Sequence, residues 1–252
     1  MTLEGRIALV TGGGRGIGRA IALGLAADGA DVAVNYRRDA AAAADTVGAI
    51  EARGRHARAY AADIARYDEC ESMAQAVLTD FGFVDILVNN AGVASRGGSV
   101  VKTDPAEPHK LFDTHVYGAW AMSKLLIPAM RERPRGDIVM ISSAAVLQMA
   151  ANSAPYNMAK AALEALAWTL AKEERRHGIH VNVVAPGLVD TEMGRRLVKG
   201  AAGVDDIRTM DAAAPFGHVC SPEEVADVVR FAVSERARYL TAQRLGVDGG
   251  PF

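Results

Sequence analysis

The chain has 252 residues, half of them hydrophobic, and a formal charge of −2 at pH 7. This length suits one α/β domain with a sizeable core, and the near-neutral charge gives no electrostatic basis for nucleic acid or an anionic membrane as a partner. Two isolated cysteines, Cys70 and Cys220, indicate a reducing compartment, and the amino terminus lacks a signal-peptide pattern, so we expect a cytoplasmic protein.

Short apolar runs alternate with alanine-rich amphipathic segments along the chain. Continuous apolar strands that alternate with helices indicate a parallel sheet covered on both faces. We therefore expect one doubly wound α/β domain over residues 1–252. Its seven-stranded parallel sheet would use residues 6–10, 31–36, 56–61, 85–90, 137–142, 180–185 and 244–248. The least regular stretch, 189–218, is a candidate substrate lid, with a plain surface excursion as the alternative.

The first strand leads into a glycine-rich turn, TGGGRGIG at residues 11–18, just before the first helix. Glycines allow a tight turn and close approach of backbone N–H groups to phosphate, and a helix N-terminus favours an anion. The spacing differs from the usual G-x-G-x-x-G, and a tight turn without a ligand is the alternative. The sequence favours a dinucleotide phosphate site formed by Gly12, Arg15, Gly16, Ile17 and Gly18.

The second strand ends with Tyr36, Arg37 and Arg38. NAD-preferring folds place an acidic residue near this point to bind the ribose 2′-hydroxyl, whereas an arginine accommodates a 2′-phosphate. Tyr36 stands where the acid would be, and Arg15 projects from the glycine turn. Two guanidinium groups favour NADP(H). The alternative is that Arg37 and Arg38 form a solvated run and that NAD(H) is also used.

Ser143, Tyr156 and Lys160 stand in S-x12-Y-x3-K spacing. Tyr156 and Lys160 lie one turn apart on the same helix face. A nearby ammonium favours the phenolate, so we expect Lys160 to lower the pKa of Tyr156 and make it a usable proton donor and acceptor. A serine at the end of the preceding strand could hold a substrate oxygen. Ser142 is the competing serine.

These motifs together resemble the short-chain dehydrogenase/reductase family over nearly the whole chain, and most closely its 3-oxoacyl-[acyl-carrier-protein] reductase-like branch. The resemblance rests on residues 11–18, Asp63-Ile64, residues 89–92, Ser143, residues 156–160, Pro186-Gly187 with Thr191, and residues 247–250.

The resemblance implies a Rossmann-type fold and hydride transfer between NADP(H) and a small-molecule carbonyl or secondary alcohol. Tyr156 would be the general acid/base, Ser143 would hydrogen-bond the substrate oxygen, and Lys160 would contact the nicotinamide ribose. Further cofactor contacts are implied for Asp63, Ile64, Asn90, Ala91, Gly92, Pro186, Gly187, Val189 and Thr191. Asp63 has an alternative role as a turn or cap residue.

The chain departs from the family at His115. The segment FDTHVYG, residues 112–118, resembles the family's F-D-V-N-V-x-G helix, in which the asparagine holds a proton-relay water near the lysine. Two interpretations remain open. His115 keeps the relay with altered pH dependence, since imidazole titrates near neutral pH, or it packs in the core and the relay is weakened.

Two rival functions are considered: a 3-oxoacyl thioester reductase, and a dinucleotide-sensing protein without turnover. In the first, Pro134 and His177 stand where the family has carrier-protein-docking arginines. The second would predict loss of the serine, tyrosine or lysine.

Other patterns are assigned structural roles. The spacing of His177 and His180 is not taken as a metal site, because a histidine in a last helical turn more often serves the helix dipole. Basic residues near helix ends would be solvated or would meet an acidic partner; they are Arg131, Arg133, Arg135, Arg175 and Arg176. By resemblance, helices over 105–132 and 154–177 would form a homodimer face, and the C-terminal strand a second face that completes a homotetramer.

Overall fold

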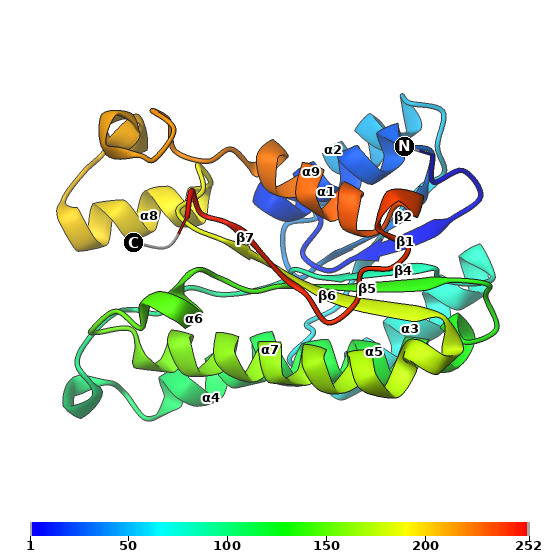
Figure 1. Cartoon of the computed structure of the whole chain (residues 1–252), viewed down its shortest axis with the longest axis horizontal. Helices are drawn as coiled ribbons and strands as arrows, with labels where there is room; N and C mark the ends of the chain where they lie inside the picture. The colour runs from blue at the N-terminus through cyan, green and yellow to red at the C-terminus, as the bar shows by residue number, and fades with distance from the viewer. Residues whose placement is uncertain (1, 251–252) are drawn as a thin grey trace.

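The computed structural model describes residues 2–250 and contains one seven-stranded parallel sheet in the order β3-β2-β1-β4-β5-β6-β7 (Figure 1). The prediction of a doubly wound parallel sheet is confirmed. Each expected strand is present, and each of its ends differs from the predicted one by at most one residue. The strands are β1 (Ile7–Val10), β2 (Asp31–Tyr36), β3 (Ala57–Ala61), β4 (Ile86–Asn89), β5 (Gly136–Ile141), β6 (Ile179–Pro186) and β7 (Arg244–Val247).

Helices cover both faces of the sheet in two layers (Figure 1). One layer contains α1 (Gly16–Ala27), α2 (Ala40–Glu51) and α9 (Pro222–Ala232), and the other contains α3 (Tyr67–Phe81), α5 (Gly118–Met130) and α7 (Ala154–Glu174). Each layer buries its apolar side chains against one face of the sheet, which explains why the central strands are apolar on both faces. Over residues 2–250, no helix combines the length and the apolarity needed to span a bilayer.

The order in which strands are added to the sheet reverses between β1 and β4, because β2 and β3 lie on one side of β1 and the later strands lie on the other. In open α/β sheets, ligands bind beyond the carboxyl ends of the strands at this switch point. The glycine turn after β1 and the segment after β4 therefore meet at one edge of the sheet, where a dinucleotide would lie.

The predicted helix over 105–132 is interrupted in the structure. It consists of α4 (Ala106–Phe112), a π-helical segment (Asp113–Tyr117) and α5. Single π-helical turns within α-helices are frequently found at functional sites, and this one contains His115.

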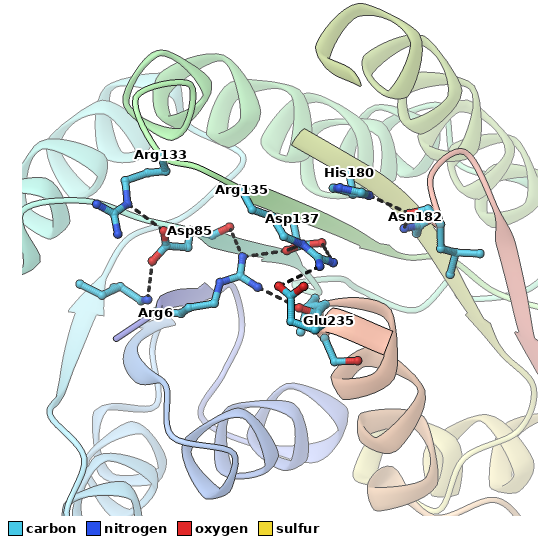
Figure 2. Close-up of polar contacts among 12 residues, drawn as sticks. Arg6, Asp85, Arg133, Arg135, Asp137, His180, Asn182 and Glu235 are labelled. Carbon is cyan, nitrogen blue, oxygen red and sulfur yellow. Dashed lines mark hydrogen bonds and ion pairs between the residues drawn. The ribbon is translucent and has the colours of Figure 1, made fainter. Parts of the chain in front are cut away.

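A largely buried network of ion pairs lies at the end of the sheet where β1, β4 and β5 begin (Figure 2). This end is called the amino edge below. Arg6 donates to Asp137 Oδ2 at 2.7 Å and to the Asp85 carbonyl oxygen at 3.2 Å. Arg135 contacts both carboxylate oxygens of Asp137, at 2.9 and 3.0 Å, and Arg133 donates to Asp85 Oδ1 at 2.9 Å. Arg133 and Arg135 are therefore not solvated helix-end residues; they neutralise buried carboxylates between neighbouring strands.

Of the other basic residues near helix ends, Arg131 is paired, and Arg175 and Arg176 are exposed. Arg131 donates to both carboxylate oxygens of Glu174 at 2.6 and 2.8 Å, so it joins the C-terminal ends of α5 and α7. Arg175 and Arg176 are exposed at the end of α7, as the solvated interpretation expects.

The segment 189–218 is more regular than its sequence suggests. It forms α8 (Glu192–Ala202) and a 3-10 helix (Ile207–Ala213), and it encloses a small core of its own made by Val198, Ile207 and Val219. In Figure 1, α8 lies at the same end of the sheet as α6 (Ala145–Gln148), beyond the carboxyl end of β6.

Candidate functional site

The glycine turn after β1 is held by side chains from two neighbouring strands. Gly12 and Gly16 adopt positive φ angles of 63° and 54°, a conformation that glycine adopts without strain. The Gly12 N–H donates to Asn35 Oδ1 at 3.1 Å, and Asn90 Nδ2 donates to the Thr11 carbonyl oxygen at 2.9 Å. Asn35 was missed from the sequence, although a polar residue within the apolar strand DVAVNY is a usable signal.

The start of α1 is open to an anion. Among residues 2–250, no side chain caps this helix, and its first turn carries no acidic residue. The backbone N–H groups of Gly16, Ile17 and Gly18 therefore remain available at the positive end of the helix dipole. A Cβ on Gly18 would lie 2.5 Å from Asn90 Nδ2, so a larger residue would disturb the turn. These features fit the pyrophosphate of a nicotinamide dinucleotide.

Both predicted phosphate-binding arginines have carboxylate partners in the structure. Arg15 forms an ion pair with Glu192 of α8 at 2.9 Å, and Arg37 forms one with Asp63 at 3.6 Å. All four side chains are partly exposed, and Arg38 is exposed beside Arg37. Exposed ion pairs are weak, so an incoming phosphate dianion would compete effectively for the guanidinium groups.

The predicted adenosine wall lies after β3 and β4. Asp63 Oδ1 accepts from the Ala65 N–H at 3.1 Å, so Asp63 is a turn residue as well as a partner of Arg37. Ile64 is buried in the core rather than open to a ligand. The backbone N–H groups of Asn90 and Ala91 both donate to Thr11 Oγ1, at 2.9 and 3.1 Å, which fixes the end of β4 against the glycine turn.

After β5 and β6, where the sequence predicts contacts to the nicotinamide, the two chain segments are joined by a hydrogen bond from the Ala144 N–H to the Pro186 carbonyl oxygen at 2.8 Å. Gly187 follows directly, and Val189 is buried. Thr191 caps α8 by accepting from the Gly194 N–H at 3.0 Å.

Thr191 also meets the glycine turn: its Cγ2 lies 3.4 Å from the Cβ position of Gly16. The predicted residues after β6 therefore border the glycine turn that the sequence assigns to phosphate.

The structure brings Ser143, Tyr156 and Lys160 together at the carboxyl end of β5. Ser143 follows this strand, and the other two residues lie in the first two turns of α7. Lys160 Nζ lies 5.7 Å from the centre of the Tyr156 ring and donates to the Ile141 carbonyl oxygen at 2.7 Å. Ser142 is buried and bonded elsewhere, so Ser143 is the serine at the site.

The electrostatics differ from the expectation in one respect. Burial raises the pKa of Tyr156, and the Ser143 hydroxyl only partly opposes this effect. Burial also lowers the pKa of Lys160 to about 7, against an opposing contribution from Glu164. The expected lowering of the Tyr156 pKa is therefore not found in this structure, because desolvation of the buried phenol outweighs the contributions that favour its ionised form.

His115 is 4% exposed and packs edge-on to Tyr156, with ring centres 5.6 Å apart. Its Nε2 lies 2.9 Å from the Val93 carbonyl oxygen and 3.2 Å from the Val93 backbone nitrogen, whereas Nδ1 is buried and has no hydrogen-bond partner within residues 2–250. Burial and the charge of Lys160 lower the pKa of His115 to about 3. The imidazole is neutral, so titration of His115 near neutral pH is not found.

Gly92 explains how the imidazole fits. A Cβ on Gly92 would lie 2.5 Å from Cε1 of His115. A side chain here would displace the ring that contacts Tyr156, so Gly92 contributes to the site by leaving space.

A family model described as enoyl-(acyl carrier protein) reductase matches residues 12–251, nearly the whole chain. The chain belongs to the short-chain dehydrogenase/reductase family. It is therefore an enzyme of a family of oxidoreductases that bind a nicotinamide dinucleotide.

Individual members of the family are similar over the full length. The 3-oxoacyl-[acyl-carrier-protein] reductase of Escherichia coli K12 is 37% identical over 255 residues, which cover 100% of this chain and 99% of the relative. A short-chain dehydrogenase from Burkholderia cenocepacia, crystallised with NADP, has a TM-score of 0.90 at 34% identity, with 99% of both chains covered. An NAD⁺-bound xylitol dehydrogenase has a TM-score of 0.92 at 27% identity, with 99% of this chain and 100% of that chain covered.

Proposed function

We propose that this protein reduces a ketone or aldehyde with NADPH, or oxidises the corresponding alcohol with NADP⁺. The observation that carries the proposal is the convergence of Ser143, Tyr156 and Lys160 at the carboxyl end of β5, beside the switch point of the sheet. The bound nicotinamide would supply the hydride, and the protein would supply position and electrostatics.

Each of the three residues has a defined task in this reaction. Tyr156 would donate a proton to the developing alkoxide and remove it in the reverse direction. Ser143 would hydrogen-bond the substrate oxygen. Lys160 would contact the nicotinamide ribose and, when protonated, favour the phenolate of Tyr156. Because burial opposes ionisation of both groups, the charge on Lys160 limits how well Tyr156 exchanges its proton.

The preference for NADP(H) is supported by Arg15 and Arg37, with Arg38 beside them. The complex of the Burkholderia cenocepacia dehydrogenase with NADP is consistent with it, and the NAD⁺-bound xylitol dehydrogenase keeps NAD(H) as the alternative. The carboxylate of Asp63, near Arg37, would repel a 2′-phosphate. The ion pair between Arg37 and Asp63 is partly exposed and contributes little, so little stabilisation is lost when Arg37 turns to the phosphate.

The remaining cofactor contacts would come from the strand ends described above. Asp63 and Ile64 would border the adenine, and Asn90, Ala91 and Gly92 the adenosine ribose. Pro186, Gly187, Val189 and Thr191 would border the nicotinamide or the pyrophosphate.

A panel of ketones and aldehydes, run with NADPH and with NADH, tests this assignment. We expect NADPH to be oxidised with at least one carbonyl class, and kcat/KM to be at least about tenfold higher than with NADH. Equal efficiencies would contradict the role given to Arg15 and Arg37. Tight NADPH binding without any turnover would favour the dinucleotide-sensing alternative.

A second candidate is reduction of a 3-oxoacyl thioester. The Escherichia coli relative carries that name, and exposed apolar side chains follow Ser143 and lie on α8, as an acyl chain would require: Leu147, Met149, Met193 and Leu197. We propose that α8 and the rest of 189–218 act as a lid over this chain. Among 3-oxoacyl thioesters of increasing length, rising kcat/KM would support the candidate, and no activity with any thioester would exclude it.

We also propose that the enzyme works as a homodimer or homotetramer, in line with its family. On the described face of α4, α5 and α7, an open apolar hollow of about 280 Å³ contains two partly exposed aromatic rings; it is lined by Phe112, Asp113, Val116, Tyr117, Trp120 and Leu166. Sedimentation of wild type and Trp120→Glu tests the proposal. We expect an oligomer that weakens in the variant, and a wild-type monomer at micromolar concentration would contradict it.

A further inference from the structure

A buried carboxylate lies directly behind the candidate catalytic serine. Glu164, on α7 one turn after Lys160, is 6% exposed. Its Oε1 accepts from Ser142 Oγ at 2.6 Å and from Arg244 Nε at 3.1 Å. Arg244 begins β7 and also donates through Nη2 to the Ser143 carbonyl oxygen at 3.1 Å. Burying a carboxylate is costly, so a carboxylate in this place requires an explanation.

The first consequence is geometric. The last residue of β5 and the two serines after it are each held by a different side chain: the Ile141 carbonyl oxygen by Lys160, the Ser142 hydroxyl by Glu164, and the Ser143 carbonyl oxygen by Arg244. Two elements far apart in sequence thus fix the strand end from behind. Small misplacements of reacting groups can reduce rates about a hundredfold, so this bracing bears directly on the site.

The second consequence is electrostatic. The groups that face Lys160 are Tyr156 and Glu164 from α7 and His115 from the π-helical segment, with Arg244 of β7 on the far side of Glu164. Burial lowers the pKa of His115 to about 3 and raises the pKa of Tyr156, so neither group supplies a charge that would favour the ammonium of Lys160. Glu164 is the carboxylate whose charge opposes the desolvation of Lys160.

We propose that Glu164 and Arg244 are positioning residues of the catalytic site: the pair fixes the strand end that carries Ser143, and Glu164 keeps Lys160 cationic. This inference rests on the proposed function, because it uses the roles assigned there to Ser143 and Lys160. Neither residue touches the reacting atoms.

Glu164→Gln tests the electrostatic part, because glutamine keeps an acceptor for Ser142 and removes the charge. In the cofactor-free protein, NMR titration of labelled lysine side chains, with Lys160→Ala for assignment, should give a Lys160 pKa at least about one unit below the wild-type value. In kinetics, the basic limb of the kcat profile for carbonyl reduction should move to lower pH by the same amount. At a pH above the basic limbs of both proteins, kcat of Glu164→Gln should therefore be about tenfold lower than that of the wild type.

Glu174→Gln is the matched control. Glu174 lies on the same helix, is 3% exposed and pairs with Arg131, far from the catalytic residues. The same chemical change there should destabilise the fold but leave the titration of Lys160 and the kinetic limb unmoved.

Arg244→Gln separates the two parts of the proposal. It removes the bond to the Ser143 carbonyl oxygen but leaves Glu164 anionic, so kcat should fall without a downward shift of the basic limb. Glu164→Asp, which keeps the charge, should restore the Lys160 pKa toward the wild-type value, and it carries the test should Glu164→Gln fail to fold.

If the Lys160 pKa in Glu164→Gln equals that of the wild type, the electrostatic part of the proposal is overturned. If the kinetics of Arg244→Gln equal those of the wild type, the bracing of the strand end is overturned. If the Lys160 pKa is as low in Glu164→Asp as in a variant with a neutral residue at this position, the role of the charge is overturned as well. Absence of carbonyl reduction in the wild type would instead contradict the proposed function, whereas the titration in the cofactor-free protein still tests the link between Glu164 and Lys160.

Discussion

Beside Tyr156 lies the buried imidazole of His115, at the position where the resemblance of residues 112–118 to the family motif leads us to expect an asparagine amide. An amide offers both a donor and an acceptor, whereas His115 has Nε2 occupied by the Val93 backbone and offers a single ring nitrogen, Nδ1. We infer that His115 supports proton transfer through this one fixed nitrogen of a neutral ring and not as a titrating group. The sequence alone singles out His115 but does not predict its protonation state, because that state depends on burial and on the neighbouring Lys160.

Replacing His115 with asparagine should move the pH–rate profile. The smaller amide desolvates Lys160 less than the imidazole does, so the pKa of Lys160 should rise and the basic limb of kcat should shift to higher pH. Steady-state kinetics of wild type and His115→Asn across the pH range provide the measurement. Superimposable profiles would show that His115 has no part in the proton path.

The same residue should make stability depend on pH. Its pKa is about 3 in the fold and 6.5 as the ordinary value, so the unfolded chain binds the proton that the fold rejects. Stability is therefore complete above about pH 6.5 and falls as the pH decreases toward 3. Urea unfolding at pH 7 and pH 5 should show a loss about 2 kcal/mol larger in wild type than in His115→Asn. Equal losses in both proteins would contradict the buried, neutral imidazole.

Among the individual elements, the helix predicted over 154–177 is found as α7 (Ala154–Glu174), whereas two other segments differ from their prediction. The π-helical turn at Asp113–Tyr117 is invisible in the pattern, since one widened turn leaves the apolar spacing on both sides nearly unchanged. Helix α8 is obscured by Gly194 and Gly200, which lower helix propensity, although Thr191 caps its start. Tertiary contacts supply what local preference lacks: Val198 of α8 packs on Ile207 and Val219.

Helix α9 offers a test of local capping. Ser221 and Glu224 form a reciprocal capping box, with Pro222 at the first helical position. Ser221→Ala should lower the free energy of unfolding by about 1 kcal/mol, because a backbone N–H loses its partner. Thermal or urea unfolding measures this change, with Ser221→Thr as the control that keeps the cap. A variant with alanine as stable as the wild type would show that α9 is fixed by its packing on the sheet and α1 alone.

At the scale of the whole molecule, the strand pattern and the order of motifs were sufficient to predict the sheet and to place the site at its carboxyl edge. Alternating apolar strands and helices leave few other arrangements. The pairing of charges was not predictable in the same way. Arg6 meets Asp137 only because β1, β4 and β5 are neighbours in the sheet, and the two residues are 131 positions apart in the chain. The bracing of Ser143 by Glu164 and Arg244 was missed for the same reason.

Arg6→Met should weaken the molecule without altering the site. The change leaves the Asp85 and Val233 carbonyl oxygens without their arginine and leaves Asp137 with Arg135 alone. Removing one member of a buried ion pair costs about 3–5 kcal/mol, so urea unfolding at pH 7 should show a loss of that order. NADPH affinity should remain unchanged, because the network lies at the amino edge, opposite the glycine turn. A large change in affinity with intact stability would contradict this separation.

We propose that Tyr156 exchanges the proton while a nicotinamide cofactor carries the hydride. The most direct test is NADPH oxidation with the best carbonyl substrate, comparing wild type with Tyr156→Phe, while NADPH binding is followed by fluorescence. We expect kcat to fall at least about a hundredfold in Tyr156→Phe and NADPH binding to change little. Activity that survives in Tyr156→Phe would instead assign the proton to another group.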